Sequence, residues 1–215
     1  MKLLLLLAVL AAPAQAVPDT IAERTKACMA CHGKAGDDVY FPRIAGKPGS
    51  YLYQQLINFR DGRRSYPAMN YLVAHLSDDY LREMADYFAS LEPRLPALAP
   101  AAPASVMEQG RKLVFDGDKS RKLPACVACH GQRLTGMLPA IPGLLGLPPA
   151  YLKAQIGAWR SGTRKAAAPD CMLHVSQQLT PQEIGAVASW LAHQPVPTDK
   201  APSPALASAC RSAQP

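Results

Sequence analysis

The chain has 215 residues, a length that fits two domains of roughly 100 residues each. It carries 23 Lys and Arg residues against 16 Asp and Glu, and from residue 101 onward twelve basic residues stand against six acidic ones. No aromatic residues are interleaved with these charges in the way a nucleic-acid-binding surface requires, so composition and charge argue against a nucleic-acid-binding protein.

The N-terminus has the parts of a secretory signal peptide. Lys2 precedes the apolar run LLLLLAVLAA, and the triplet AQA that ends at Ala16 is a small-x-small cleavage site. The run is too short to cross a bilayer of about 30 Å as a helix, and an uncleaved anchor is the alternative. We expect cleavage after Ala16, with residues 1–16 removed, and export into an oxidising compartment.

The same five-residue motif occurs twice, as CMACH at 28–32 and as CVACH at 126–130. The spacing C-x-x-C-H is the attachment site of c-type haem, in which two cysteines one helical turn apart form thioethers and the adjacent histidine lies under the iron. A zinc site needs four ligands in one cluster, and a redox-active dithiol normally opens a helix after a strand. We therefore predict two covalently attached haem c groups, bound by Cys28, Cys31, Cys126 and Cys129 and ligated by His32 and His130.

The two halves of the chain also match each other outside the motifs. The segment PGSYLYQQLINFRDGRR at 48–64 aligns with PPAYLKAQIGAWRSGTR at 148–164 at an offset of 100. The segment starting at Leu76 aligns with the one starting at Leu179 at an offset of 103. This pattern indicates an internal duplication, so each half should carry one copy of the same fold.

Both halves show the apolar spacing of three and four residues that is typical of helices. We expect middle helices near 50–61 and 149–161 and closing helices near 78–91 and 181–193. Helix starts are indicated by a cap at Ser77 and by capping boxes that begin at Ser105 and Thr180. The predicted fold class is all-α, with two tandem domains related by duplication.

A Pro- and Ala-rich segment separates the halves and has the composition of a semi-rigid linker. An irregular loop within one domain is the alternative. The predicted organisation is a first domain at 17–91, a linker at 92–104, a second domain at 105–195 and a C-terminal tail at 196–215.

The sixth iron ligand decides whether a haem exchanges electrons or binds a substrate. Met69 and Met172 are the predicted ligands, because the offset of 103 that aligns the closing helices also superimposes these two methionines. Met84 and Met137 are expected to be packing residues. His75 and His174 are the competitors, although the offset does not pair them.

A ligating histidine usually has its second ring nitrogen held by a hydrogen-bond partner. Pro42 lies ten residues after His32, and Pro142 lies twelve residues after His130. We expect the carbonyl groups of these prolines to accept from the two histidines, with a turn proline that has no such role as the alternative.

These motifs resemble those of dihaem class I cytochromes c of the cytochrome c4 type, over nearly all of the chain after the signal peptide. The resemblance implies a periplasmic two-domain electron carrier whose two haems face each other across the domain interface. It implies redox partner proteins, namely a dehydrogenase, a respiratory complex or a terminal oxidase. It also implies haem-edge or propionate contacts for Tyr51, Gln55, Tyr151 and Gln155, with packing of the middle helix as the alternative.

Two cysteines remain after haem attachment, Cys171 and Cys210. In an exported protein they are predicted to form a disulfide that ties the tail to the second domain. Free thiols, an intermolecular bridge or thiolate ligation of the second iron by Cys171 are the alternatives.

A basic run precedes the second motif and contains Arg111, Lys112, Lys119, Arg121 and Lys122. It is either a docking face for an acidic redox partner or a solvated surface. We expect an electron carrier and no enzyme, because methionines that fill the sixth position leave no open iron. A haem enzyme, either a dihaem peroxidase or a thiosulfate-oxidising cytochrome, is the alternative function.

Overall fold

The computed structural model describes residues 18–33 and 41–204. The predicted signal peptide and Cys210 lie outside these residues. Within the described part of the chain, no helix is both long and apolar enough to cross a membrane.

The first half consists of helices, and its middle and closing helices lie within one or two residues of the predicted bounds. In chain order its elements are α1 (Ile21–Arg24), α2 (Lys26–His32), α3 (Gly49–Arg60), α4 (Pro67–Val73) and α5 (Asp78–Ser90). Helix α3 packs along α5, and α1 packs against α5.

The second half repeats the middle and closing helices and adds a small hairpin. Its elements are α6 (Ala104–Phe115), the 3-10 helix η1 (Lys119–Arg121), α7 (Val127–His130), β1 (Gly136–Met137), β2 (Ile141–Pro142), α8 (Pro149–Arg160), α9 (Cys171–Gln178) and α10 (Pro181–His193). Strands β1 and β2 are antiparallel and pair Met137 with Ile141. Helix α10 packs against both α6 and α8.

The predicted caps are confirmed at two of three helix starts. The Ser77 hydroxyl accepts from the backbone N–H of Tyr80, and Thr180 forms the complete capping box with Glu183. The box predicted at Ser105 is wrong. Helix α6 begins one residue earlier, after Pro103, and the Glu108 carboxylate pairs instead with a nearby arginine one turn later in the helix.

The core of the second half is built where α6 crosses α10. Gly110 lies at this crossing, and a Cβ atom there would lie 2.7 Å from the Cβ of Trp190. The ring of Phe115 contacts the Trp190 ring edge-on at 5.4 Å between centroids. Leu191 and Val114 are almost completely buried in the same cluster. The missing side chain at Gly110 therefore sets how closely the two helices approach.

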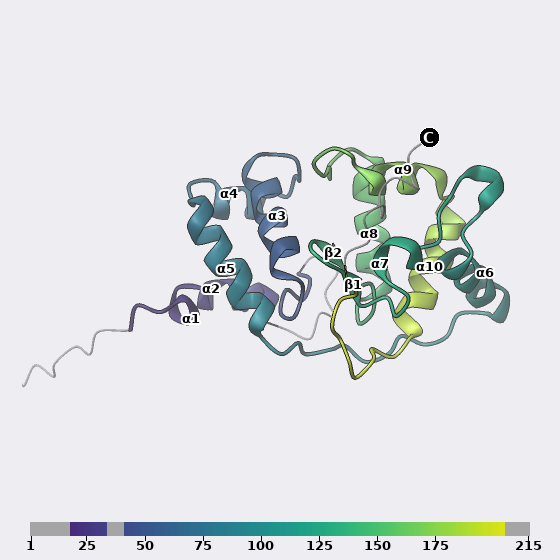
Figure 1. Ribbon diagram of the computed structural model, residues 1–215, viewed down its shortest axis with the longest axis horizontal. Helices are drawn as coiled ribbons and strands as arrows, with labels where there is room; N and C mark the ends of the chain where they lie inside the picture. Colours follow the sequence, from purple (N-terminus) through teal and green to yellow (C-terminus); the bar gives the residue numbers. More distant parts are fainter. Residues whose placement is uncertain (1–17, 34–40, 205–215) are drawn as a thin grey trace, which may run out of the picture.

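The two halves form two lobes that lie side by side, with α1–α5 in one and α6–α10 in the other (Figure 1). They meet through the turns that end α3 and α8, where Arg64 and Arg164 form an antiparallel backbone bridge. The N–H of Ser65 donates to the carbonyl of Thr163 at 2.7 Å, and the N–H of Lys165 donates to that of Arg63 at 2.7 Å. Equivalent turns of the two halves are thus paired with each other.

The segment from 91 to 103 contains no helix or strand. This segment packs against the second half. The N–H of Ala99 donates to the carbonyl of Ala192, and the His193 ring contacts the Ala99 carbonyl at 2.8 Å. The described part of the tail, up to residue 204, also contacts the second half. Ser203 pairs with the hairpin, donating to the Gly136 carbonyl at 2.9 Å.

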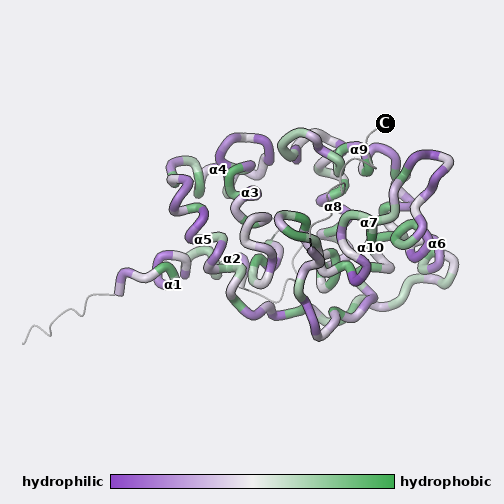
Figure 2. The backbone as a smooth tube through the Cα atoms, viewed as in Figure 1, coloured by the Kyte–Doolittle hydropathy of each residue, from purple (hydrophilic) through white to green (hydrophobic). Residues whose placement is uncertain are grey.

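The loop that carries the hairpin is apolar, and Figure 2 shows it as a hydrophobic segment near the middle of the molecule. Leu134, Leu145 and Leu147 are buried there among residues of the second core. The apolar character of this loop therefore reflects its place under the second CxxCH motif and beside the first half.

Candidate haem-binding sites

The first motif lies on helix α2, which places Cys28 and Cys31 one turn apart. Cys28 is half-buried and packs against the core of the first half, whereas Cys31 is exposed. His32 ends the helix, and its Nδ1 lies 2.7 Å from the carbonyl oxygen of Pro42. A carbonyl only accepts, so Nδ1 carries the proton and Nε2 keeps a free lone pair.

The second motif has the same geometry on the shorter helix α7. Cys126 is the N-cap of this helix, and burial raises the pKa of its thiol to about 12. His130 is 8% exposed, and its Nδ1 lies 2.8 Å from the carbonyl oxygen of Pro142. The predicted proline carbonyl contacts are therefore confirmed in both halves.

Burial favours the neutral form of both histidines, which is the form that binds metals. Burial lowers the pKa of His32 and of His130, and the proline carbonyls act in the opposite direction. A neutral imidazole with one nitrogen fixed by a carbonyl is the ordinary state of a metal-ligating histidine. Among the described residues, no group of three His, Cys, Asp or Glu side chains is arranged to hold a metal ion. Each motif offers two thiols and one imidazole, which fits haem attachment better than a four-ligand zinc site.

The predicted methionine ligands lie on two short helices in equivalent places. Met69 is on α4 and, like Cys28, packs against a core cluster of the first half, and Met172 is half-buried in the first turn of α9. Of the competing histidines, His75 is exposed and the Nε2 of His174 contacts the Gln178 amide at 3.2 Å. These positions favour the methionines, whose ligand role stays a prediction.

The two residues expected to be packing methionines are buried. Met84 is 6% exposed in the core of the first half, and Met137 is 2% exposed in β1. Cys171 begins helix α9 beside Met172, whereas its predicted disulfide partner Cys210 lies outside the described residues.

The four predicted haem-edge residues meet between the halves in one hydrogen-bonded network. Arg64 donates to Gln55 at 3.1 Å and to Gln155 at 2.7 Å. Arg164 donates to the same two amide oxygens, at 3.2 Å and 2.7 Å, and to the hydroxyl of Tyr51 at 3.2 Å. Tyr151 is 6% exposed, and burial raises the pKa of its hydroxyl. The network is nearly symmetric, because its three residues from the first half each have a residue of the same type 100 positions later in the second half.

Sequence reasoning missed the arginines of this network and two further buried cations. Arg43 is 8% exposed, Lys47 is 7% exposed and Arg164 is 5% exposed. The Nε of Arg43 is buried and has no hydrogen-bond partner. No carboxylate among the described residues forms an ion pair with Arg43, Lys47, Arg64 or Arg164. The offset of 100 pairs Arg64 with Arg164, and this signal was present in the sequence.

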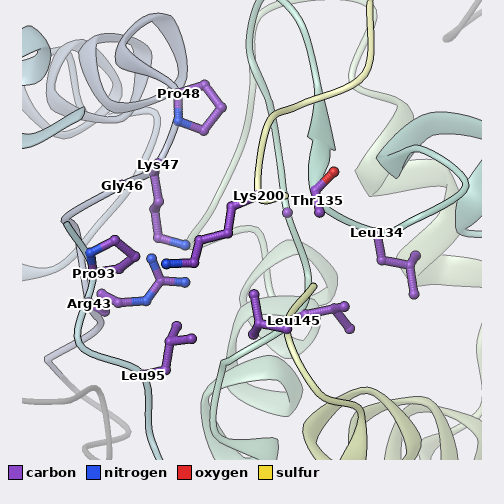
Figure 3. A pocket seen from close by; sticks show the side chains of 12 residues that line it. Arg43, Gly46, Lys47, Pro48, Pro93, Leu95, Leu134, Thr135, Leu145 and Lys200 are labelled. Atoms are coloured by element: carbon purple, nitrogen blue, oxygen red, sulfur yellow. The ribbon is translucent and has the colours of Figure 1, made fainter. Parts of the chain in front are cut away.

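Buried cations are stabilised by anions, and the described residues supply no carboxylate to these four. Burial, together with the charges of Arg43, Arg164 and Arg64, lowers the pKa of Lys47 to about 7. In Figure 3, Arg43, Lys47 and Lys200 converge on a cavity between the halves. The volume of this cavity is about 40 Å³. Two haems would bring four propionate carboxylates, so the residues present fit the cofactor that the motifs predict.

The basic run before the second motif is partly neutralised. Arg111 pairs with Glu108, and Arg121 pairs with Asp118 and Glu183. The three lysines of the run are exposed. Pairing of the two arginines favours a stabilising role for them and leaves only the lysines for docking.

Comparison with known proteins agrees with this geometry. A family model described as cytochrome c matches residues 107–195. A thiosulfate dehydrogenase electron acceptor from Thiomonas intermedia is 37% identical over 82% of each chain. The crystal structure of reduced recombinant cytochrome c4 from Pseudomonas stutzeri superimposes with a TM-score of 0.69 at 30% identity, over 80% of this chain and 95% of that one.

The chain belongs to the cytochrome c4-type family of class I cytochromes c. It is an all-α electron-transfer cytochrome with covalently bound haem c, as the motifs predicted. A solved thiosulfate dehydrogenase from Marichromatium purpuratum also superimposes on this cytochrome, with a TM-score of 0.69 at 34% identity over 79% of this chain. The match spans only 36% of that longer chain.

Proposed function

We propose that this cytochrome holds one haem c in each half and carries electrons from a thiosulfate dehydrogenase to a further redox protein. The observation that carries the proposal is the duplicated site, in which each CxxCH histidine donates Nδ1–H to a proline carbonyl ten or twelve residues later. The proposed attachment residues are Cys28, Cys31, Cys126 and Cys129, and the proposed axial ligands are His32, Met69, His130 and Met172.

The chain's own residues account for two tasks of a carrier, which are to hold the haem irons in fixed coordination and to compensate the charge of the haem propionates. The proline carbonyls fix the proximal imidazole rings, so the ligands need not reorganise when charge changes. Met69 and Met172 would fill the remaining axial positions and keep substrates from the irons. Haem supplies reversible one-electron exchange through its exposed edge when it is bound. The network around Arg64 and Arg164 lies between the halves, where it would compensate the propionate charges of both groups.

The choice of donor rests on the relatives. The Thiomonas intermedia protein is named as an electron acceptor of thiosulfate dehydrogenase, and the matched structure is of such a dehydrogenase. Because this chain is related to the acceptor and also matches part of the dehydrogenase structure, its best-supported role is to accept electrons from that enzyme. A respiratory complex or a terminal oxidase is the proposed acceptor class.

We also propose that the protein is periplasmic and that its signal peptide is cleaved after Ala16. The domain organisation that follows is a first domain at 17–91, a linker at 92–104, a second domain at 105–195 and a tail at 196–215. The proposal is supported by the signal-like N-terminal sequence and by the helix-free segment from 91 to 103.

The proposed donor is tested by mixing the oxidised holoprotein with thiosulfate and a catalytic amount of thiosulfate dehydrogenase. We expect full reduction with an uptake of two electrons per chain, and no reduction by thiosulfate when the dehydrogenase is omitted. Turnover of thiosulfate by this chain alone would show that it is an enzyme. A lack of reduction in the presence of an active dehydrogenase would show that its donor is another protein.

A further inference from the structure

The short helix α4 carries Met69 and packs beside α3 (Figure 1). It has seven residues, and a helix of this length is not stable by itself in water. Its Val73 is 2% exposed, whereas Tyr71 and Leu72 are 83% and 62% exposed. Contacts with the rest of the protein must therefore hold α4, and with it Met69, in place.

Asn70, the residue after Met69, holds α4 through three hydrogen bonds to the backbone. Its Oδ1 accepts from the N–H of Tyr66 at 2.7 Å, so it takes up a backbone donor at the start of the helix. Its Nδ2 donates to the carbonyl of Phe59 at 2.5 Å and to that of Arg64 at 2.9 Å. One side chain therefore joins α4 to the end of α3 and to the turn that follows α3.

The bond to Arg64 connects α4 to the other half of the molecule. The peptide group between Arg64 and Ser65 accepts from Asn70 through its carbonyl. The N–H of the same peptide group donates to the carbonyl of Thr163 at 2.7 Å. Hydrogen bonds in such a chain polarise and strengthen one another. The position of Met69 is therefore tied to the contact between the two halves through this peptide group.

The second half holds its methionine in another way. The offset of 103 places Leu173 opposite Asn70, and a leucine side chain has no hydrogen-bonding group. Asp170 caps α9, accepting from the N–H of Leu173 at 3.1 Å and from that of Ala166 at 2.7 Å. Both bonds stay within one segment of the second half. A change at Asn70 should therefore affect the first site and leave the second as an internal reference.

We propose that Asn70 is a positioning residue for the sixth ligand of the haem held by His32, and that it makes the position of this ligand depend on the contact between the halves. The inference rests on the proposed assignment of Met69 as that ligand. Loss of both Asn70 donors leaves the carbonyls of Phe59 and Arg64 without this partner and frees α4 from the turn. The ferric iron then exchanges its thioether more readily for an added ligand, without a change of oxidation state.

The proposal is tested by titrating the oxidised holoprotein with imidazole, which replaces methionine on the iron, and by following the far-red absorption of methionine-ligated ferric haem. Asn70→Leu copies the second half and removes all three bonds, whereas Asn70→Asp keeps the acceptor for Tyr66 and removes both donors. Ser77→Ala is the matched control, because it removes a comparable hydrogen bond, from the N–H of Tyr80, at the start of α5. Each titration is repeated in a Met172→Ala background, where the remaining far-red signal belongs to the first haem.

In both Asn70 variants we expect half-displacement of Met69 at an imidazole concentration about tenfold lower than in the wild type, because two hydrogen bonds that hold α4 are lost. Ser77→Ala, and the second haem in every variant, should stay within about threefold of the wild type. An unchanged first haem, or an equal shift at both haems, would overturn the proposal. If Asn70→Asp titrates as the wild type does, the link to the turn is wrong. Absence of a far-red signal from Met172→Ala before imidazole is added would overturn the ligand assignment itself, and the proposal with it.

Discussion

The crossing of α6 and α10 at Gly110 gives a sharp test of how the second half is packed. In the variant Gly110→Ala, the new methyl group would lie 2.7 Å from the Cβ of Trp190 and closer still to the carbonyl oxygen of Ala186. Backbone atoms of α10 cannot rotate away as a flexible side chain could. The two helices must therefore move apart, which loosens the buried cluster around Leu191.

The expected magnitude is the balance of two opposing terms. Alanine is favoured over glycine in a helix by about 1 kcal/mol. Overpacking of a well-packed core costs about 1–3 kcal/mol, and a clash with backbone belongs at the upper end of this range. We expect Gly110→Ala to lower the free energy of unfolding by about 1–2 kcal/mol. Gly185→Ala on α10 is the matched control, because nothing lies within 4 Å of its added methyl group, and it should stabilise by about 0.5–1 kcal/mol.

Thermal unfolding of the oxidised holoprotein, followed by tryptophan fluorescence, measures this difference. Both tryptophans, Trp159 and Trp190, lie in the second half, so the signal reports on that half. A separation of about 2 kcal/mol between the two variants corresponds to roughly 4–8 °C in Tm. A Gly110→Ala protein as stable as Gly185→Ala would refute the close approach of the two helices.

Three further predictions concern the irons and the acid stability. Met69→Ala and Met172→Ala should each remove the far-red absorption of one methionine-ligated ferric haem, and persistence of the full signal in either variant would show that another residue is the ligand. The reduced holoprotein should bind carbon monoxide poorly, and rapid stoichiometric binding would indicate an open iron. Hydrogen bonds from Ser120 and Arg121 lower the pKa of Asp118 to about 2, so its contribution to stability is present above about pH 4 and is lost as the pH falls through about 2. Asp118→Asn should therefore unfold with a shallower pH dependence in this range, as measured by circular dichroism at a series of pH values, and an unchanged slope would contradict the assigned shift.

The helices that pack along the core were predictable because their apolar residues recur at helical spacing over three or more turns. Helices α3, α5, α8 and α10 all lie within two residues of the bounds expected from the sequence. The short helices α4 and α9 were not predicted, since seven or eight residues are too few for the spacing to be distinctive. The cap at Ser105 failed because Pro103 already allows the helix to start.

The local part of the haem sites was also predictable, because each CxxCH motif and its proline lie within twelve residues of each other. The network between the halves was predicted only in part. Tyr51 and Gln55 were expected there, whereas the arginine that binds Gln55 was not. A contact such as Arg64 with Gln155 depends on how two separately folded halves face each other, and helical periodicity within either half carries no such information.

The backbone bridge between Arg64 and Arg164 has a consequence for how the molecule is assembled. Because equivalent turns pair with each other, the contact is of the self-complementary kind that relates the two subunits of a symmetric dimer. The segment from 91 to 103 then acts as a tether, which keeps two such subunits at an effective concentration in the millimolar range. On this view the covalent connection supplies proximity, and the paired turns supply the orientation.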